Sequence, residues 1–263
     1  MDKQNIISKH IGILCAMPEE IGSTLDNLRN IETKTFGDLK IYSGDWCFSN
    51  ASSKNPHIYL SIAWSGWGKV SAARAATRLI SHKFNELKID AIFFTGVAGA
   101  INPKLKQWDI VIADELIQHD MDARPLFKKH EIPALKKVKI KSSESISNWT
   151  LNALKNSIKD GPLETFGDLH KGLIATGDKF ISNKEDVKNL SKDIKDLFAV
   201  EMEGASVGQV AKQEKVPFQI IRVISDEANE SSPEDFSKFL KKYNQHSAKL
   251  ISALVENLKN SPI

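Results

Sequence analysis

Short runs of hydrophobic residues recur along the chain, and they are rich in β-branched and aromatic side chains. Runs of this length and composition are typical of buried β-strands. They lie at residues 11–15, 58–63, 91–95, 110–113, 172–176, 198–200 and 218–224. A further stretch at 34–50 has alternating character around Gly37, Gly44 and Asp45, which predicts a hairpin attached to the main sheet.

Segments with helical periodicity lie between several of these runs. The predicted helices span residues 69–87, 145–158, 184–190, 205–214 and 233–258. Such an alternation of strands and helices indicates an α/β domain. A chain of 263 residues with 41% hydrophobic residues can bury a substantial core, and no repeat or low-complexity linker divides it. We therefore predict a single domain over residues 1–263.

Two stretches fall outside this pattern. Residues 1–10 precede the first predicted strand and are interpreted as an N-terminal extension. Residues 128–143 contain Pro133 and many lysines, which predicts a lid or an insertion.

The charge of the chain argues against nucleic acid as a partner. The 36 Lys and Arg residues against 33 Asp and Glu leave a net charge of only +3, and the lysine clusters have no interleaved aromatic residues. Cys15 and Cys47 lack the spacing of metal ligands, and the hydrophobic run at 11–17 is too short to cross a membrane. We expect a cytoplasmic protein that uses no metal ion and no cofactor.

Polar residues just after the predicted strands are the first candidates for chemistry, because ligands of open α/β sheets bind outside the strand ends. Two of these exits are rich in glycine, but neither has the pattern of a dinucleotide- or phosphate-binding loop. Three others bring the carboxylates Glu20, Glu203 and Asp226. Taken singly, Glu203 could be an acid that favours the start of a helix, and Asp226 could be a helix cap.

Five motifs together resemble the 5′-methylthioadenosine/S-adenosylhomocysteine nucleosidases. They are the segments AMPEE at 16–20, SGWGKV at 65–70, GDKFI at 177–181, VEMEG at 200–204 and RVISD at 222–226. That family belongs to the superfamily of purine nucleoside and uridine phosphorylases. The resemblance implies a three-layer fold with a central mixed sheet flanked by helices, and it implies a homodimer.

The resemblance also implies a role for each of five residues. Asp226 would protonate adenine N7 with Ser225 orienting its carboxyl group, which requires an aspartic acid that burial keeps protonated. Glu20 would be the ionised base that activates water, and Arg222 would help to hold that water. Glu203 would bind the ribose hydroxyls. By analogy with two-carboxylate glycosidases, the anomeric carbon would be inverted.

Further residues are implied to line the substrate pocket. At adenine, Phe180 would stack on the ring and the Ile181 backbone would read its edge. Met202 would pack against the sugar, with Glu201 beside it. Around the 5′-alkylthio group the resemblance places Met17, Trp67 and Phe236. For Phe180 and Met17, simple core packing is the alternative.

A polar loop resembles the segment that crosses the dimer interface in this family. It contains His119, Met121 and Asp122. No second histidine lies near His119, so a metal site is not indicated. Two positions depart from the family pattern: Val97 stands near the ribose where some members have Ser or Thr, and Asn229 stands where an acid often follows.

We therefore predict that the protein hydrolyses the N-glycosidic bond of methylthioadenosine and adenosylhomocysteine, with water as the second substrate. One alternative is hydrolysis of aminodeoxyfutalosine, which carries the same adenine and ribose. Another is phosphorolysis, although a carboxylate at the position of Glu20 would repel phosphate. A non-enzymatic nucleoside-binding protein would be expected to lack one of the three carboxylates, and all three are present.

Overall fold

The core of the protein is one large mixed β-sheet. The computed structural model describes residues 8–49, 57–159, 161–228 and 232–263. Within them the strands follow the order β11-β10-β8-β12-β7-β1-β4-β3-β2, with β9 paired to β8. Their bounds are β1 (Ser8–Cys15), β2 (Leu28–Phe36), β3 (Leu39–Trp46), β4 (His57–Trp64), β7 (Ala91–Ala100), β8 (Ile110–Gln118), β9 (Lys139–Lys141), β10 (Leu169–Thr176), β11 (Leu197–Glu201) and β12 (Phe218–Asp226).

Most strands of the main sheet form two parallel sets, which meet antiparallel between β12 and β8 and between β7 and β11. Strands β4, β1, β7 and β12 are parallel to one another, whereas β8 and β10 run parallel to each other with β8 antiparallel to β12. Strand β7 extends far enough for Gly99 and Ala100 to pair antiparallel with β11. This pairing closes β7, β12, β8, β10 and β11 into a ring. The ends of strands from both sets are therefore brought together.

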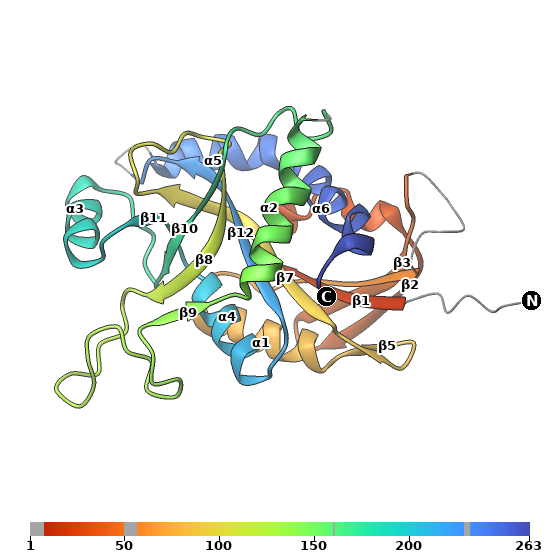
Figure 1. Cartoon of the computed structure of the whole chain (residues 1–263), viewed down its shortest axis with the longest axis horizontal. Helices are drawn as coiled ribbons and strands as arrows, with labels where there is room; N and C mark the ends of the chain where they lie inside the picture. Colours follow the sequence, from red (N-terminus) through yellow and green to blue (C-terminus); the bar gives the residue numbers. More distant parts are fainter. Residues whose placement is uncertain (1–7, 50–56, 160, 229–231) are drawn as a thin grey trace, which may run out of the picture.

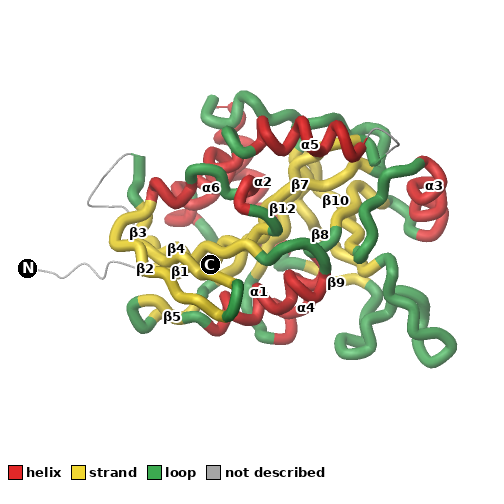
Figure 2. The backbone as a smooth tube through the Cα atoms, turned by 180° about the vertical axis from the view of Figure 1, so that it is seen from behind, coloured by secondary structure: helices red, strands yellow, loops and turns green. Residues whose placement is uncertain are grey.

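Helices cover both faces of the sheet (Figures 1 and 2). Their bounds are α1 (Lys69–Ser81), α2 (Glu144–Lys159), α3 (Lys184–Asp193), α4 (Gly204–Gln213), α5 (Ser232–Tyr243) and α6 (Ser247–Glu256), with short 3-10 turns η1 (Pro18–Glu20), η2 (Thr24–Asn27) and η3 (Leu258–Asn260). Helices α1 and α4 bury one hydrophobic cluster against the sheet, and α2, α5 and α6 bury another on its opposite face. The predicted three-layer α/β fold with a mixed central sheet is confirmed.

The pattern of small residues in α1 explains how closely this helix packs. Ala72, Ala75, Ala76 and Leu79 are all buried and lie on one face of the helix, at a spacing of three to four residues. Strand β12, covered by helices on both faces, is buried at every position from Phe218 to Asp226. Such a strand has a continuous apolar sequence rather than an alternating one.

Two predicted helices were too long. The segment predicted at 69–87 leaves the helix after Ser81, and strands β5 (Lys83–Phe84) and β6 (Leu87–Lys88) form a small hairpin there. Its turn residues Asn85 and Glu86 both have positive φ, as tight hairpin turns require. The segment predicted at 233–258 is two helices, α5 and α6, separated at residues 244–246.

The hairpin predicted at 34–50 is present as β2 and β3, and β3 pairs with β4 of the main sheet. Strand β2 begins earlier than predicted, at Leu28, and most of its residues are exposed. Because nearly all side chains of β2 are exposed, on both faces of the strand, its sequence lacks the alternation of a half-buried strand.

The two stretches set apart by sequence contain parts of the sheet. Strand β1 begins at Ser8, inside the predicted extension, and residues 1–7 lie outside the described part of the chain. The segment 128–143 includes β9, and its Ile132 and Ile140 are buried.

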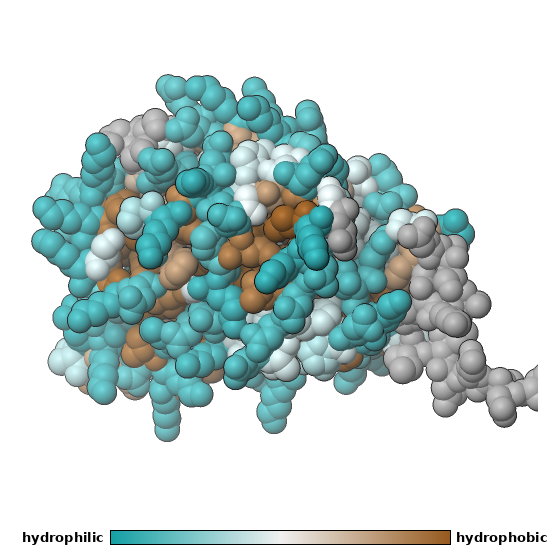
Figure 3. Space-filling model, turned by 45° about the horizontal axis from the view of Figure 1, so that its top comes forward, coloured by the Kyte–Doolittle hydropathy of each residue, from teal (hydrophilic) through white to brown (hydrophobic). Residues whose placement is uncertain are grey.

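Hydrophilic side chains cover most of the face in Figure 3, and hydrophobic ones gather in its recesses. Among the described helices, none combines the length and the apolar character needed to cross a membrane.

Candidate functional site

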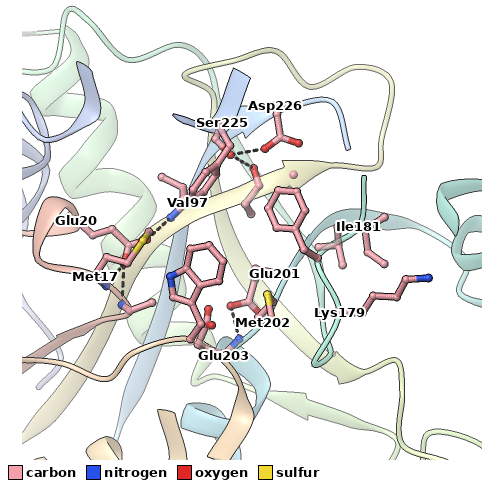
Figure 4. Close-up of a pocket in the computed structure, with 17 residues that line it drawn as sticks. Met17, Glu20, Val97, Lys179, Ile181, Glu201, Met202, Glu203, Ser225 and Asp226 are labelled. Carbon is pink, nitrogen blue, oxygen red and sulfur yellow. Dashed lines mark hydrogen bonds between the residues drawn. The ribbon is translucent and has the colours of Figure 1, made fainter. Parts of the chain in front are cut away.

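A pocket lies where the ends of β1, β7, β11 and β12 meet. Its lining is Ala16, Met17, Glu20, Trp67, Val97, Ala98, Gly99, Lys179, Phe180, Ile181, Val200, Glu201, Met202, Glu203, Ser225, Asp226 and Phe236. Figure 4 shows the carboxylates arriving from different sides, with Glu20 beside Met17, Asp226 beside Ser225, and Glu203 close to Met202. Every residue predicted to act on or bind the substrate lines this cavity, except Arg222.

Glu20 is held by backbone N–H groups from two strand ends. It closes the η1 turn, whose first residue Pro18 has the fixed φ that suits a helical start. Its Oε2 accepts from the N–H groups of Ala16 (2.7 Å) and Met17 (3.0 Å), and its Oε1 accepts from Val97 N–H (3.0 Å). Because every donor points at the carboxyl group, the arrangement suits an ionised carboxylate.

The protonation of Glu20 is set by opposing effects. Burial raises the pKa of Glu20, whereas Arg222 and the backbone donors lower it, and the net direction is upward. A carboxylate with a raised pKa accepts a proton from water more readily than an ordinary glutamate does. The surroundings of Glu20 therefore make its carboxylate more basic than that of an exposed glutamate.

Arg222 lies behind the cavity and is fully buried in the middle of β12. Its guanidinium donates to Glu201, faces Glu203 Oε2 at 3.7 Å and lies 4.1 Å from the centre of the Phe94 ring. Burial lowers the pKa of Arg222, but the neighbouring carboxylates outweigh this effect and leave the pKa raised. Arg222 is thus a permanent buried cation that offsets the negative charge of the site.

Gly96 makes room for this cation next to the base. A Cβ atom at Gly96 would occupy the space taken by Arg222 Nη1 and Glu20 Oε1. Any side chain at this position of β7 would separate the two groups or displace them. The absence of a side chain at Gly96 therefore allows Arg222 and Glu20 to lie close together.

Glu201 anchors the start of helix α4. Its Oε2 accepts from the backbone N–H groups of Glu203 (3.1 Å) and Gly204 (2.7 Å), and its Oε1 accepts from the Thr176 hydroxyl. As the acceptor, Glu201 Oε2 satisfies N–H groups that the first turn of a helix leaves free. Glu201 lines the cavity, but its oxygens are engaged by the protein, and the result is a fixed position for Glu203.

Glu203 presents its carboxyl group to the cavity from the position just before α4. Its Oε1 accepts from Gly68 N–H at 2.7 Å, which links it to the loop between β4 and α1. Burial and the nearby charge of Glu201 raise the pKa of Glu203 to about 8. Near neutral pH this group therefore retains a proton that an exposed glutamate would have lost.

This raised pKa predicts an unusual effect of pH on stability. Between the ordinary pKa of 4.5 and about 8, folded Glu203 keeps its proton while the unfolded chain releases it, so the free energy of unfolding falls as pH rises. Glu203→Gln cannot titrate and can still accept from Gly68. We expect its melting temperature, relative to the unsubstituted protein, to rise between pH 5 and pH 9. Each kcal/mol gained corresponds to about 2–4 °C.

Calorimetric melting of both proteins at pH 5, 7 and 9 measures this effect. The control is Glu234→Gln, because Glu234 is exposed at the start of α5. A melting difference between Glu203→Gln and the unsubstituted protein that stays constant across this range would contradict the raised pKa.

A β-bulge directs Ser225 and Asp226 into the same cavity. Neighbouring residues of a regular strand point to opposite faces, but the register between β12 and β7 shifts between Ile224 and Asp226. Asp226 is only 5% exposed. Its Oδ2 accepts from the Ser225 hydroxyl (2.7 Å) and its Oδ1 from Ala228 N–H (2.9 Å), so the carboxyl group has a fixed orientation.

Aromatic side chains form a wall across the cavity. The ring of Phe236, on α5, makes edge contacts with Trp67 at 6.0 Å and with Phe180 at 5.8 Å between centroids. Trp67 is 51% exposed and Phe180 is half-buried. These exposed ring faces provide apolar surface for a flat or thioether-bearing ligand.

The predicted interface loop does not contribute to this cavity. His119 contacts Gly177 and lines a separate groove, Met121 accepts from His130 N–H through its carbonyl oxygen, and Asp122 pairs with Arg124. The segment 128–143 contributes no lining residue either. Asn229 lies outside the described residues. In the described part of the chain, no group of three or more His, Cys, Asp or Glu residues could hold a metal ion.

Five residues that line the cavity were missed from the sequence: Ala16, Ala98, Gly99, Lys179 and Val200. Each of them lies within two positions of a predicted residue, and Lys179 lies inside the motif at 177–181. Small and apolar residues carry no chemical signal of their own, so only their position next to a motif could have identified them.

Comparison with known proteins agrees with this geometry. A family model described as the phosphorylase superfamily matches residues 10–256. A 5′-methylthioadenosine/S-adenosylhomocysteine nucleosidase from Shewanella loihica is 33% identical over 250 residues, which is 94% of this chain and 99% of the relative. The chain also resembles solved structures that carry this name and a related one.

One is the Neisseria meningitidis nucleosidase of the same name in complex with methylthio-immucillin-A, with a TM-score of 0.80, 29% identity and coverage of 94% and 99% of the two chains. Another is the futalosine hydrolase of Helicobacter pylori, with a TM-score of 0.78, 32% identity and coverage of 94% and 97%. The chain belongs to the 5′-methylthioadenosine/S-adenosylhomocysteine nucleosidase family of the phosphorylase superfamily.

Proposed function

We propose that the protein hydrolyses the N-glycosidic bond of 5′-methylthioadenosine and S-adenosylhomocysteine, releasing adenine and the 5-thioribose derivative. The observation that carries the proposal is the convergence of Glu20, Glu203 and Asp226 on one cavity with an aromatic wall. Each carboxyl group sits in a different environment, which is what three different roles require.

In the reaction, the bond between C1′ and N9 breaks and its electron pair moves to adenine. Asp226 transfers a proton to N7, which makes adenine a neutral leaving group. Glu20 removes a proton from water, and the water oxygen forms the new bond to C1′. Proton return from Glu20 to Asp226 through solvent completes the cycle, so that one water molecule is consumed.

Glu203 acts on the sugar during this step. Its carboxyl group would bind the ribose hydroxyls, next to the ring on which positive charge develops. Glu201 and Gly68 hold Glu203 from both sides, so little reorganisation is needed as the charge develops. Adenine would stack on Phe180, and the 5′ substituent would contact Met17, Trp67 and Phe236.

Hydrolysis is favoured over phosphorolysis by the surroundings of Glu20. A phosphate dianion would need cationic or N–H donors beside C1′. Here three N–H groups next to the cavity already serve Glu20, and Arg222 is engaged with Glu201. A buried carboxylate at this position repels an anion and activates a neutral water.

A second candidate substrate is aminodeoxyfutalosine. It is favoured by the likeness of the chain to the Helicobacter pylori futalosine hydrolase. It also carries the same adenine and ribose, which would make the same contacts in the pocket. The two substrates differ only at the 5′ group, and the half-exposed Trp67 at that end leaves room for substituents of different size.

An assay of adenine release tests the reaction and the substrate together. We expect adenine from methylthioadenosine and adenosylhomocysteine, at the same rate with and without phosphate. Inosine serves as the matched control, because its base lacks the 6-amino group. A strict requirement for phosphate would show that the reaction is phosphorolysis and not hydrolysis. Release of adenine from aminodeoxyfutalosine alone would favour the second candidate substrate.

We also propose a homodimer that acts in the cytoplasm in methionine salvage. The loop with His119, Met121 and Asp122 would contact the second subunit, and the exposed Leu126 and Phe127 in the same loop support this assignment. The two free cysteines support a reducing compartment. The molar mass in solution decides the oligomeric state.

A further inference from the structure

Three charged residues at the rim of the cavity form a closed network that the proposed chemistry does not use. Lys69 N–H donates to Asp178 Oδ1 (2.8 Å), and Asp178 N–H donates to Asp120 Oδ2 (2.9 Å). The Lys69 ammonium closes the ring by donating to Asp120 Oδ1 (2.6 Å). The three residues come from α1 and from the segments after β8 and β10, so the network joins three separate parts of the chain.

The network meets the substrate site on both sides. Asp178 is two residues before Phe180, on the side where adenine would bind. Lys69 follows Gly68, whose N–H donates to the ribose-side carboxylate Glu203 at 2.7 Å. Two successive N–H groups at the start of α1 therefore hold one carboxylate from each half of the site.

Gly68 leaves room for the Asp178 carboxyl group at the start of α1. Gly68 has φ +90°, and a Cβ atom there would lie 3.0 Å from Asp178 Oδ1. As the residue before α1, Gly68 has no side chain that could cap the helix, and Asp178 supplies the missing acceptor from another loop.

We propose that Lys69, Asp120 and Asp178 are positioning residues that fix the adenine-binding segment 180–181 relative to Glu203. The inference rests on the proposed function, because a nucleoside must contact both halves at once. Adenine alone contacts only one half, so its binding does not depend on the spacing between them.

This role separates catalysis from stability. Asp120 and Asp178 are exposed, and ion pairs near the surface contribute little to folding stability. Misplacement of a substrate by about 1 Å, in contrast, can cost up to about 100-fold in rate. Loss of the network should therefore lower kcat much more than it lowers the melting temperature.

The test compares Asp178→Ala, Asp178→Asn and Asp120→Ala with Asp38→Ala. Asp38 also pairs with a residue of α1, Arg74, but its side chain is 88% exposed and it is not part of the network. For methylthioadenosine we expect kcat to fall about 10–100-fold in the two alanine variants at positions 120 and 178. Asp178→Asn, which keeps the acceptor for Lys69 N–H, and Asp38→Ala should stay close to the unsubstituted protein.

The dissociation constant for adenine alone should be the same in all five proteins. Unchanged kcat in Asp178→Ala, or a parallel loss of adenine binding, would overturn the positioning role. Hydrogen exchange of the backbone amides at 66–70 gives a readout that does not require turnover. We expect faster exchange in the alanine variants at 120 and 178 only. Equal exchange in all proteins would overturn the proposed role of the network, and this result does not depend on which nucleoside is the substrate.

Discussion

Asp226→Asn is expected to lower kcat for methylthioadenosine by about 10²–10⁴-fold, the usual contribution of a positioned general acid. Asparagine can still accept from Ala228 N–H and can hydrogen-bond to adenine, but it has no proton to transfer to N7. The fold should be preserved, because Asp226 lies at the end of β12 and its neighbours in the hydrophobic core are unchanged. Steady-state kinetics and thermal melting measure the two effects separately.

A substrate that needs no acid gives the sharpest control for this variant. In a 5-methylthioribosyl derivative of 4-nitrophenol, the 4-nitrophenolate leaving group departs without protonation. Asp226→Asn should therefore cleave this substrate nearly as well as the unsubstituted protein. Equal losses on both substrates would show that Asp226 positions the ligand and does not act as the acid. Asp38→Asn is the matched surface substitution.

The second large effect is expected at Glu20. Glu20→Ala should lower the rate of hydrolysis by about 10²–10⁴-fold, because its neighbours in the described lining, Ala16, Met17 and Val97, have no side chain that can take the proton of water. Glu20→Gln is a less clean variant. Its amide NH₂ group would face the N–H groups of Ala16 and Met17, which are donors as well.

The alanine variant leaves those N–H groups and Arg222 beside an empty, positively polarised space. Azide should enter it and attack C1′, so that added azide restores adenine release and yields a ribosyl azide. Product analysis by mass spectrometry detects it. Hydrolysis by Glu20→Ala at the original rate, with no azide product, would remove the role of Glu20 as base.

The strongest sequence signals were those set by burial. Strands β7 and β12 are covered on both faces and were predicted as continuous apolar runs, and Ser225 and Asp226 at the end of β12 were predicted with them. The errors occurred where tertiary contacts override local pattern. The end of α1 at Ser81 depends on the turn at Asn85 and Glu86, and β2 is a strand only because β3 lies beside it.

The site could be predicted as a set of residues, but its internal connections could not. That Glu201 holds Arg222 and the start of α4, rather than being free for substrate, follows from distances between segments far apart in the sequence. The bulge that turns Asp226 towards Ser225 is a shift of register that no motif encodes. The network of Lys69, Asp120 and Asp178 lay inside or beside recognised motifs, yet only the fold brings its members together.

Strand order has a consequence for how the enzyme can change. The proposed acid Asp226 is carried by β12 and the proposed base Glu20 follows β1, and β7 lies between these two strands in the sheet. Neighbouring hydrogen-bonded strands keep a nearly constant separation. The two strand spacings between β12 and β1, about 9–10 Å in all, therefore fix the distance between the strand that carries Asp226 and the strand that precedes Glu20. The residues assigned to the 5′ substituent belong instead to η1, a loop and α5. Substitutions in those segments can therefore accommodate new 5′ groups without changing the separation of β12 and β1.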